Sequence, residues 1–240
     1  MKIAISQPTY LPWLGYFDLI DQVDQVDVFV LLDDVQFERR SWQHCNRMKT
    51  PIGLQWLTVP VMFHGRFSQF LKDVEIRDAE FSRTHLRAFE QNDRRSRFFD
   101  RYFVDLGACP KCTAGALLAD LDLRPLEWLA SAMGIRTRLV RSSGLQQAGR
   151  RSERLANICA RVGADQYISP LGSAGYLLEE VNLRADRAIA VAFQHCEYPQ
   201  YAQLIFNEGE RSLEILRSGR RHPFSTLQVI EQVQARRQAS

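Results

Sequence analysis

Cysteine is scarce in this sequence, and its spacing argues against a disulfide scaffold. The 240 residues hold five scattered cysteines, whereas disulfide-stapled domains carry them in pairs. Cys109 and Cys112 form a CxxC pair, but a structural zinc site needs a second pair. A redox CxxC motif ends a strand and opens a helix, whereas these residues follow a predicted helix. We therefore expect no metal site, with a redox or zinc role for this pair as the lesser alternative.

Long apolar runs and a strong net charge are also missing. No stretch approaches the roughly 20 apolar residues that cross a bilayer. Met1-Lys2 leads directly into a predicted strand rather than into a signal peptide. A net charge of +3 is too small to indicate a nucleic-acid-binding protein. We expect a cytoplasmic protein with no membrane span and no nucleic-acid partner, while a peripheral role at a membrane and the oligomeric state stay open.

The common catalytic motifs are absent. The sequence contains no GxGxxG, no Walker Gly-Lys-Ser or Gly-Lys-Thr, no nucleophile elbow and no HExxH. Among its five histidines, His85 lies near a predicted helix start and His195 at a predicted strand end. A lone histidine is more often structural than catalytic, but we keep His85 as a candidate catalytic residue.

Apolar periodicity predicts an α/β fold. The near-continuous apolar run over residues 26–32 is typical of a strand that is buried on both faces. From residue 116 onward, helical patterns alternate with strands, which predicts parallel pairing and a three-layer sandwich around a mainly parallel sheet. We assign residues 1–203 to one α/β domain and 204–240 to a helical C-terminal extension of it. Strands are predicted at 3–5, 26–32, 55–61, 74–76, 137–140, 166–169 and 188–193, and helices at 18–23, 81–103 with Ser82 as N-cap, 117–133 and 152–162.

The first candidate site is the segment QPTYLPWLGYF, residues 7–17, which connects the first strand to a helix. Its prolines, aromatic residues and glycine predict a stiff loop. The backbone N–H groups at a helix N-terminus suit an anion, and open α/β sheets bind ligands at such strand ends. The alternative is an ordinary buried loop with the aromatic residues in the core. Candidate binding residues here are Gln7, Tyr10, Trp13, Gly15 and Tyr16.

The second candidate region follows the second strand. Asp33 and Asp34 are placed to orient a substrate amine or to bind Mg²⁺, or else they form a turn with Asp34 as a helix N-cap. Residues 39–49 then combine basic side chains, which suit phosphate, with a stacking indole; the alternative is a solvated basic loop. Candidate catalytic residues here are Asp33 and Arg47, and candidate binding residues are Asp34, Gln36, Trp42, Asn46 and Lys49.

Two later loops complete the candidate site. Residues 169–176 are mostly small and follow a strand, so they predict either a second phosphate-binding loop, with Ser173 near a helix start, or a tight turn. Residues 197–203 are aromatic and polar, and either close over a ligand or pack as an irregular cap. Candidate binding residues in these loops are Ser169, Gly172, Ser173, Tyr176, Tyr198, Tyr201 and Gln203.

Several of these motifs together resemble the WbqC-like family, over roughly residues 1–220. The resemblance is carried by residues 7–17, 30–37, 40–42, 46–47, 56–61, 167–173, 176–177 and 198–203. The family is associated with bacterial O-antigen and related surface-polysaccharide gene clusters. The resemblance therefore implies a role in lipopolysaccharide or related glycan biosynthesis, and indicates the pathway more closely than the reaction.

A second, weaker likeness concerns the cofactor. The turn at Trp13-Leu14-Gly15-Tyr16 is similar to the His-x-Gly-His loop of nucleotidylyltransferases and pantothenate synthetases, whose histidines hold ATP phosphates. Here Trp13 and Tyr16 replace the histidines. The likeness implies a nucleotidylyltransferase-like fold, with ATP and Mg²⁺ as candidate cofactors.

The leading hypothesis is an enzyme that transfers or ligates an acyl group, glycyl being one candidate, onto a nucleotide-linked amino sugar. Its partners would be that sugar and a small acyl or amino-acid donor. In this scheme Gly15 and Ser173 line the phosphate site, Arg47 and Lys49 neutralise charge, and Asp33 orients the amine. The alternatives are a nucleotidylyltransferase that makes an activated sugar, and a non-catalytic module that binds a nucleotide-sugar or glycan.

Overall fold

A mainly parallel sheet forms the centre of the molecule. In this computed structural model, the structure describes residues 1–12, 17–66, 68–108, 113–170, 173, 189–195, 204–225 and 228–229. The sheet has the strand order β5-β2-β1-β6-β7-β8, in which the first five strands are parallel and β8 is antiparallel to β7. Its strands are β1 (Lys2–Ser6), β2 (Val28–Leu31), β5 (Arg138–Arg141), β6 (Gln166–Ser169), β7 (Ala190–Phe193) and β8 (Phe224–Ser225).

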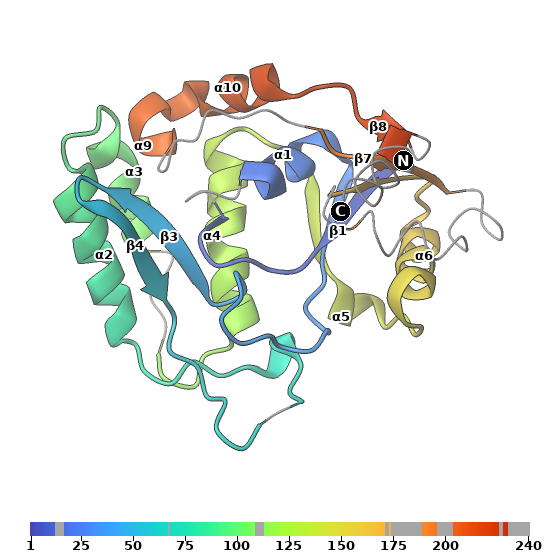
Figure 1. The fold of residues 1–240 in the computed structure, drawn as a ribbon, viewed down its shortest axis with the longest axis horizontal. Helices are drawn as coiled ribbons and strands as arrows, with labels where there is room; N and C mark the ends of the chain where they lie inside the picture. The colour runs from blue at the N-terminus through green and yellow to red at the C-terminus, as the bar shows by residue number, and fades with distance from the viewer. Residues whose placement is uncertain are drawn as a thin grey trace, which may run out of the picture.

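Helices cover both faces of this sheet (Figure 1). Side chains alternate between the two faces of a strand, so Ala4, Phe29 and Leu31 pack in a core with α1 (Phe17–Gln25) and α4 (Leu118–Ala132). On the other face, Ile3, Ile5, Val28 and Val30 pack against α6 (Arg151–Val162). The predicted three-layer α/β sandwich is thus confirmed.

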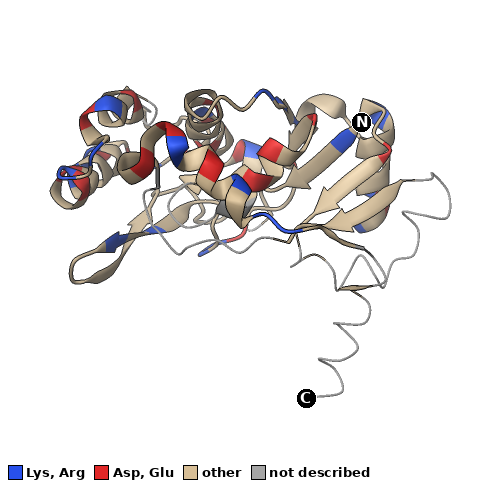
Figure 2. Cartoon of the chain, turned by 90° about the horizontal axis from the view of Figure 1, so that it is seen from above, with Lys and Arg blue, Asp and Glu red and all other residues tan. Residues whose placement is uncertain are grey.

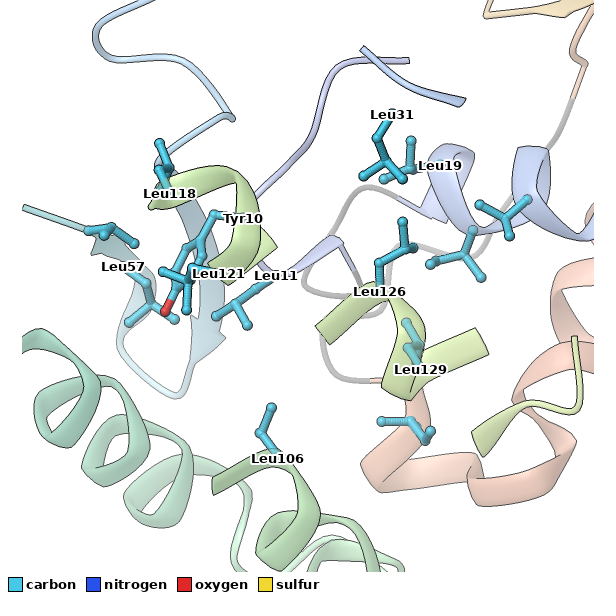
Figure 3. Close-up of a cluster of buried hydrophobic side chains, with 14 of the residues drawn as sticks. Tyr10, Leu11, Leu19, Leu31, Leu57, Leu106, Leu118, Leu121, Leu126 and Leu129 are labelled. Carbon is cyan, nitrogen blue, oxygen red and sulfur yellow. The ribbon is translucent and has the colours of Figure 1, made fainter. Parts of the chain in front are cut away.

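The chain between β2 and α4 forms a second lobe on the α4 side of the sheet. It contains an antiparallel hairpin, a short 3-10 helix and two helices, and its core is continuous with that of the sheet. In Figure 3, Leu118 and Leu121 of α4 lie near Leu57 of the hairpin, and Leu126 and Leu129 lie toward Leu19 and Leu31 on the sheet side. The elements of this lobe are β3 (Cys45–Thr50), β4 (Gly53–Thr58), η2 (Leu71–Asp73), α2 (Glu80–Asp93) and α3 (Phe99–Ala108).

Three predictions for this lobe were wrong. The predicted helix over 81–103 is two helices, and Ser82 lies inside α2 rather than capping it; Asp78 Oδ1 instead accepts from Glu80 N at 3.2 Å. The predicted strand at 74–76 makes only isolated bridges. The predicted basic loop contains β3, which pairs with β4 outside the parallel sheet.

The remaining elements follow the predictions more closely. Gly134 and Gly163 end α4 and α6 with φ of +73° and +75°, a conformation that glycine adopts at low cost. A short helix, α5 (Ser142–Leu145), precedes α6. The C-terminal segment contains α9 (Leu204–Glu208), η4 (Gly209–Arg211) and α10 (Ser212–Gly219), and adds the unpredicted strand β8. No helix in the described part of the chain has the length and apolarity needed to span a bilayer.

Candidate functional site

The candidate site is a cavity of about 340 Å³ at the carboxyl ends of the parallel strands. The chain passes from β1 to β2 on one side and later from β5 to β6 on the other, so the strand order reverses between β1 and β6. Open α/β sheets bind ligands at such a switch point, in sites of about 300–1,000 Å³. The cavity is lined by Ile5, Ser6, Gln7, Pro8, Thr9, Leu32, Glu38, Ser41, Trp42, Gln43, Leu155, Pro170 and Ser173.

Two glutamines hold one wall of the cavity in place. Gln43 Nε2 donates to Gln7 Oε1 at 2.8 Å, and Gln43 Oε1 accepts from Glu38 N at 2.8 Å. Ser41 Oγ donates to Glu38 O at 2.7 Å, and Tyr10 N donates to Trp42 O at 2.9 Å. These bonds fasten the loop before β3 across the end of β1 and so fix the shape of this wall of the cavity.

The two segments that form this wall each contain a non-glycine residue with positive φ. Leu11 has φ of +48° and Arg40 of +57°, an uncommon conformation that concentrates at functional sites. Asn46 Nδ2 donates to the Leu11 carbonyl at 2.7 Å, and Arg40 N donates to His44 Nε2 at 3.0 Å. Burial lowers the pKa of His44, consistent with a neutral imidazole that can accept this bond. The polar interior thus holds the loops in these conformations.

The lining has the chemistry of a site for a neutral or cationic polar ligand. Trp42 is 37% exposed and presents an indole face. Beside it are the amides of Gln7 and Gln43 and the hydroxyl-bearing residues Ser6, Thr9, Ser41 and Ser173. Among the described residues that line the cavity, Glu38 is the one with a charged side chain.

Of the residues predicted from the sequence, Gln7, Trp42 and Ser173 line this cavity. Ser173 N donates to Pro170 O at 3.0 Å, so this N–H is occupied within its own turn, as the tight-turn alternative requires. Ser169 is fully buried at the end of β6. The predictions at Trp13, Gly15, Tyr16, Gly172, Tyr176, Tyr198, Tyr201, Gln203, Cys109 and Cys112 lie outside the described residues.

Asp33 lies outside the cavity in a network that joins β2 to β5. Its carboxylate accepts from Ser142 Oγ at 3.1 Å, from Ser143 N at 2.9 Å and Oγ at 2.8 Å, and from Arg141 Nε at 2.7 Å. Burial raises the pKa of Asp33, but the bonds from Ser143 and Arg141 outweigh burial and lower it. Asp34 pairs with Arg154 and accepts from Ser142. Both carboxylates are therefore engaged by protein groups.

The predicted residues on and around the hairpin point in two directions. Asn46 is buried, and its Nδ2 also donates to Tyr10 O at 2.8 Å, so it converges with the 7–17 segment as a scaffold residue. Arg47 lies on the opposite face of β3, with its guanidinium 5.2 Å from the Trp42 ring centroid. Lys49 and Gln36 are exposed, and Gln36 bridges to Phe70. None of these four lines the cavity.

His85 and Tyr10 form a buried pair away from the cavity. The Tyr10 hydroxyl and His85 Nδ1 are 2.8 Å apart, and both side chains are nearly inaccessible to solvent. Burial lowers the pKa of His85 to about 4. His195 stacks on Phe224 with ring centroids 4.2 Å apart. The structure thus places both histidines in packing environments.

We expect the imidazole of His85 to titrate near pH 4 in the folded protein. Because the folded pKa lies below the unfolded value of about 6.5, the stabilisation from neutral His85 is complete above pH 6.5 and declines as the pH falls toward 4. An NMR titration of the histidine Cε1 protons, with His85→Gln to assign the signal, measures this. A midpoint near 6.5 for that signal would contradict the buried placement.

Most of the residues that line the cavity were not predicted from the sequence. Ser6, Thr9, Glu38, Ser41, Gln43 and Leu155 line the cavity but were not selected as candidates. A usable signal was present, because Ser41 and Gln43 directly flank the chosen Trp42, and Glu38 lies two residues after the chosen Gln36. Arg47 and Lys49 were selected instead, because basic side chains suit a phosphate.

A second hollow, of about 460 Å³, lies at the opposite edge of the sheet. Its lining includes four charged residues, Asp24, Asp27, Arg136 and Arg217. Asp24 and Arg217 form a salt bridge with an N–O distance of 2.8 Å, and Asp27 accepts from the Lys2 backbone N–H at 2.7 Å. We therefore place the candidate site at the carboxyl edge.

The comparison with curated proteins identifies a related chain. The sequence is 37% identical over 204 residues to the uncharacterized protein Rv1507c of Mycobacterium tuberculosis, a match that covers 85% of this chain and 86% of the relative. No solved structure matches the chain. The WbqC-like protein family matches residues 7–216, a range that contains every lining residue of the cavity numbered from Gln7 onward. The chain belongs to the WbqC-like protein family.

Proposed function

We propose that the protein transfers or ligates an acyl group onto a nucleotide-linked amino sugar in bacterial surface-polysaccharide synthesis, and that the sugar occupies the cavity between β1 and β6. One observation carries this proposal: the cavity combines an exposed indole, two amides, several hydroxyl groups and one carboxylate. An indole face packs against the apolar face of a sugar ring, and amides and hydroxyls bond to its hydroxyl groups.

Glu38 has the role that the sequence hypothesis gave to Asp33. An amino sugar enters as its ammonium form, which pairs with a carboxylate. Glu38 is exposed at the cavity, whereas Asp33 is fully buried within its own network. In the reaction, Glu38 takes a proton from the ammonium nitrogen. The neutral amine then attacks the acyl carbonyl and an N–C bond forms. The leaving group departs with the electron pair of its bond to that carbon and accepts the remaining surplus proton of the nitrogen, which leaves a neutral amide.

The nucleotide portion of the substrate would extend toward the basic residues beside the cavity. Arg40 directly precedes Ser41, and the Arg47 guanidinium contacts Trp42. Both arginines are exposed. Guanidinium groups bind phosphate oxygens in bidentate fashion. A diphosphate that extends from the cavity past Trp42 would therefore lie close to two cationic side chains.

The expected cofactors, ATP and Mg²⁺, do not fit the described residues. Both oxygens of Asp33 already accept hydrogen bonds from protein donors, and Asp34 is paired with Arg154. Glu38, the charged residue among those described in the cavity lining, is an anion and would repel a triphosphate. We therefore derive no step through ATP, and the acyl donor is treated as an already activated carboxyl.

Calorimetric titration with UDP-glucosamine and UDP-glucose tests the proposal, because the two ligands differ in one amine. We expect the amino sugar to bind more tightly. Glu38→Gln should weaken UDP-glucosamine binding by roughly 10- to 100-fold, the worth of a charge-assisted hydrogen bond, and change UDP-glucose binding little. Trp42→Ala should weaken both by at least about tenfold.

Glu80→Gln is the matched control, because Glu80 is an exposed carboxylate on α2 outside the cavity. Equal affinity of the wild-type protein for the two sugars, or equal effects of Glu38→Gln and Glu80→Gln, would contradict the role of Glu38. Mass spectrometry of UDP-glucosamine incubated with an aminoacyl or acyl thioester then separates the two classes of protein. A mass increase equal to the acyl group indicates a transferase, and tight binding without it indicates a binding module.

A further inference from the structure

The hairpin of β3 and β4 carries an exposed apolar surface whose composition the proposed function leaves unexplained. Antiparallel partners share a face of the ribbon. Asn46, Met48 and Leu57 form the buried face. The opposite face pairs Arg47 with Trp56 and Lys49 with Leu54. We call this outer face, together with Ile52 at the turn and the adjacent Trp42, the hairpin surface.

Apolar side chains on the hairpin surface become more exposed toward its tip. Trp42 is 37% exposed, Trp56 57%, Leu54 63% and Ile52 100%. Ile52 lies in the Pro51-Ile52 turn, which Gly53 closes with φ of +130°, a backbone conformation that favours glycine. This turn holds an aliphatic side chain entirely in water, where it gains nothing for the fold.

The charge of the hairpin is of one sign. No aspartate or glutamate occurs between Glu38 and Asp73, whereas this interval contains the basic residues Arg39, Arg40, Arg47, Lys49, Arg66 and Lys72. Figure 2 shows the hairpin projecting from the body of the described chain with basic residues along it. The Arg47 guanidinium lies 5.2 Å from the Trp42 centroid and 5.5 Å from that of Trp56, so the cation is held on the same face as the indoles.

We propose that the hairpin surface docks on an anionic lipid bilayer. The order of residues from the tip inward is aliphatic first, then indole and cation. A bilayer surface presents the matching layers, since aliphatic groups enter the acyl boundary, Trp favours the headgroup level, and Lys and Arg pair with anionic headgroups. Ile52 and Trp56 are about 13 Å apart along the strand, which places Trp42 and the cavity mouth beside the headgroups. Trp42 and Arg47 also belong to the proposed substrate site, but docking through Ile52, Leu54 and Trp56 does not depend on the proposed reaction.

Vesicle sedimentation of the full chain tests the proposal. We expect binding to vesicles of equimolar phosphatidylcholine and phosphatidylglycerol, much weaker binding to phosphatidylcholine alone, and release by salt. Ile52→Ser and Leu54→Ser should each weaken binding by at least about tenfold, because they remove apolar side chains that would insert. Lys49→Gln should weaken it by a few fold and reduce the salt dependence. Trp fluorescence should shift to the blue on binding, and Trp56→Phe should reduce that shift.

Val104→Ser is the matched control, since Val104 is an aliphatic residue on α3 that is 74% exposed and lies outside the hairpin. The substituted side chains are exposed, so folding should be unaffected, which circular dichroism checks. No sedimentation at low salt, or equal effects of Ile52→Ser and Val104→Ser, would overturn the proposal. A concentration-dependent dimer that Ile52→Ser abolishes, without vesicle binding, would also overturn it and assign the surface to a second copy of the chain. Titrating UDP-glucosamine without vesicles keeps this result separate from the proposed function.

Discussion

Replacing Arg220 with alanine should destabilise the protein by about 3–5 kcal/mol, the range for removing one partner of a buried ion pair. Arg220 Nε donates to Asp21 Oδ1 at 2.8 Å, and its Nη2 donates to Asp24 Oδ2 at 2.6 Å. Asp21 is fully buried and Asp24 nearly so. Without Arg220, Asp21 loses its cationic partner at the junction of α10 and α1. Urea denaturation followed by circular dichroism measures the change.

Arg217→Ala is the matched control for that experiment. Arg217 also binds Asp24 but is 54% exposed, so its loss should cost no more than about 1 kcal/mol. Burial raises the pKa of Asp24, but the bonds from Arg217 and Arg220 outweigh burial and lower it. The stabilisation is therefore present above the unfolded pKa of about 3.9 and is lost as the pH falls through the lower folded value. Equal losses for both variants, or an Arg220→Ala effect that does not shrink as the pH is lowered below 3.9, would contradict this account.

The central sheet was predictable because its strands have an unambiguous pattern. Residues 26–32 are apolar almost without interruption, and β2 is buried along its whole length. The lobe between β2 and β5 was harder to predict. β3 has the sequence CNRMKT, in which polar Asn46 occupies a buried position because it bonds to the Tyr10 and Leu11 carbonyls. Such a bond to a distant loop leaves no local sequence signal, so the strand resembled a basic loop.

The candidate cavity lies at the carboxyl edge of the sheet, where the sequence predicted a site, but the candidate residues were chosen by charge rather than by geometry. The strand order brings the ends of β1 and β6 together across the switch point, and this juxtaposition depends on crossover topology. Asp33 has the expected position after β2. Ser142 and Ser143, which are distant in the sequence, donate hydrogen bonds to its carboxylate. Glu38 is five residues away and stays exposed. Long-range partners therefore decide which acidic residue is available to a ligand.

The carboxyl group of Asp122 is buried in α4, where no described residue pairs with it. The residue is 1% exposed, and neither carboxyl oxygen has a hydrogen-bond partner among the residues that the structure describes. Burial raises the pKa of Asp122 well above its usual value. Unfolded Asp122 ionises near pH 3.9 while the folded protein retains the proton to a higher pH, so the free energy of unfolding falls as the pH rises above about 3.9. An unpaired buried polar group lowers the free energy of unfolding by about 1–3 kcal/mol. The buried surroundings of Asp122 also disfavour its ionised form.

Asp122→Asn should therefore stabilise the protein, by about 1–3 kcal/mol at pH 7, because asparagine has the same shape and does not ionise. The gain should vanish near pH 3, where the carboxyl is protonated in both states. Asp120→Asn is the matched control on the same helix. Asp120 is 43% exposed and pairs with Arg141, so the same substitution should lower stability by up to about 1 kcal/mol at pH 7. Chemical denaturation of both variants at pH 3, 5 and 7 measures the two curves. A loss of stability in Asp122→Asn at pH 7 would mean that Asp122 is ionised and paired in the folded protein, which would place a cationic partner in this core.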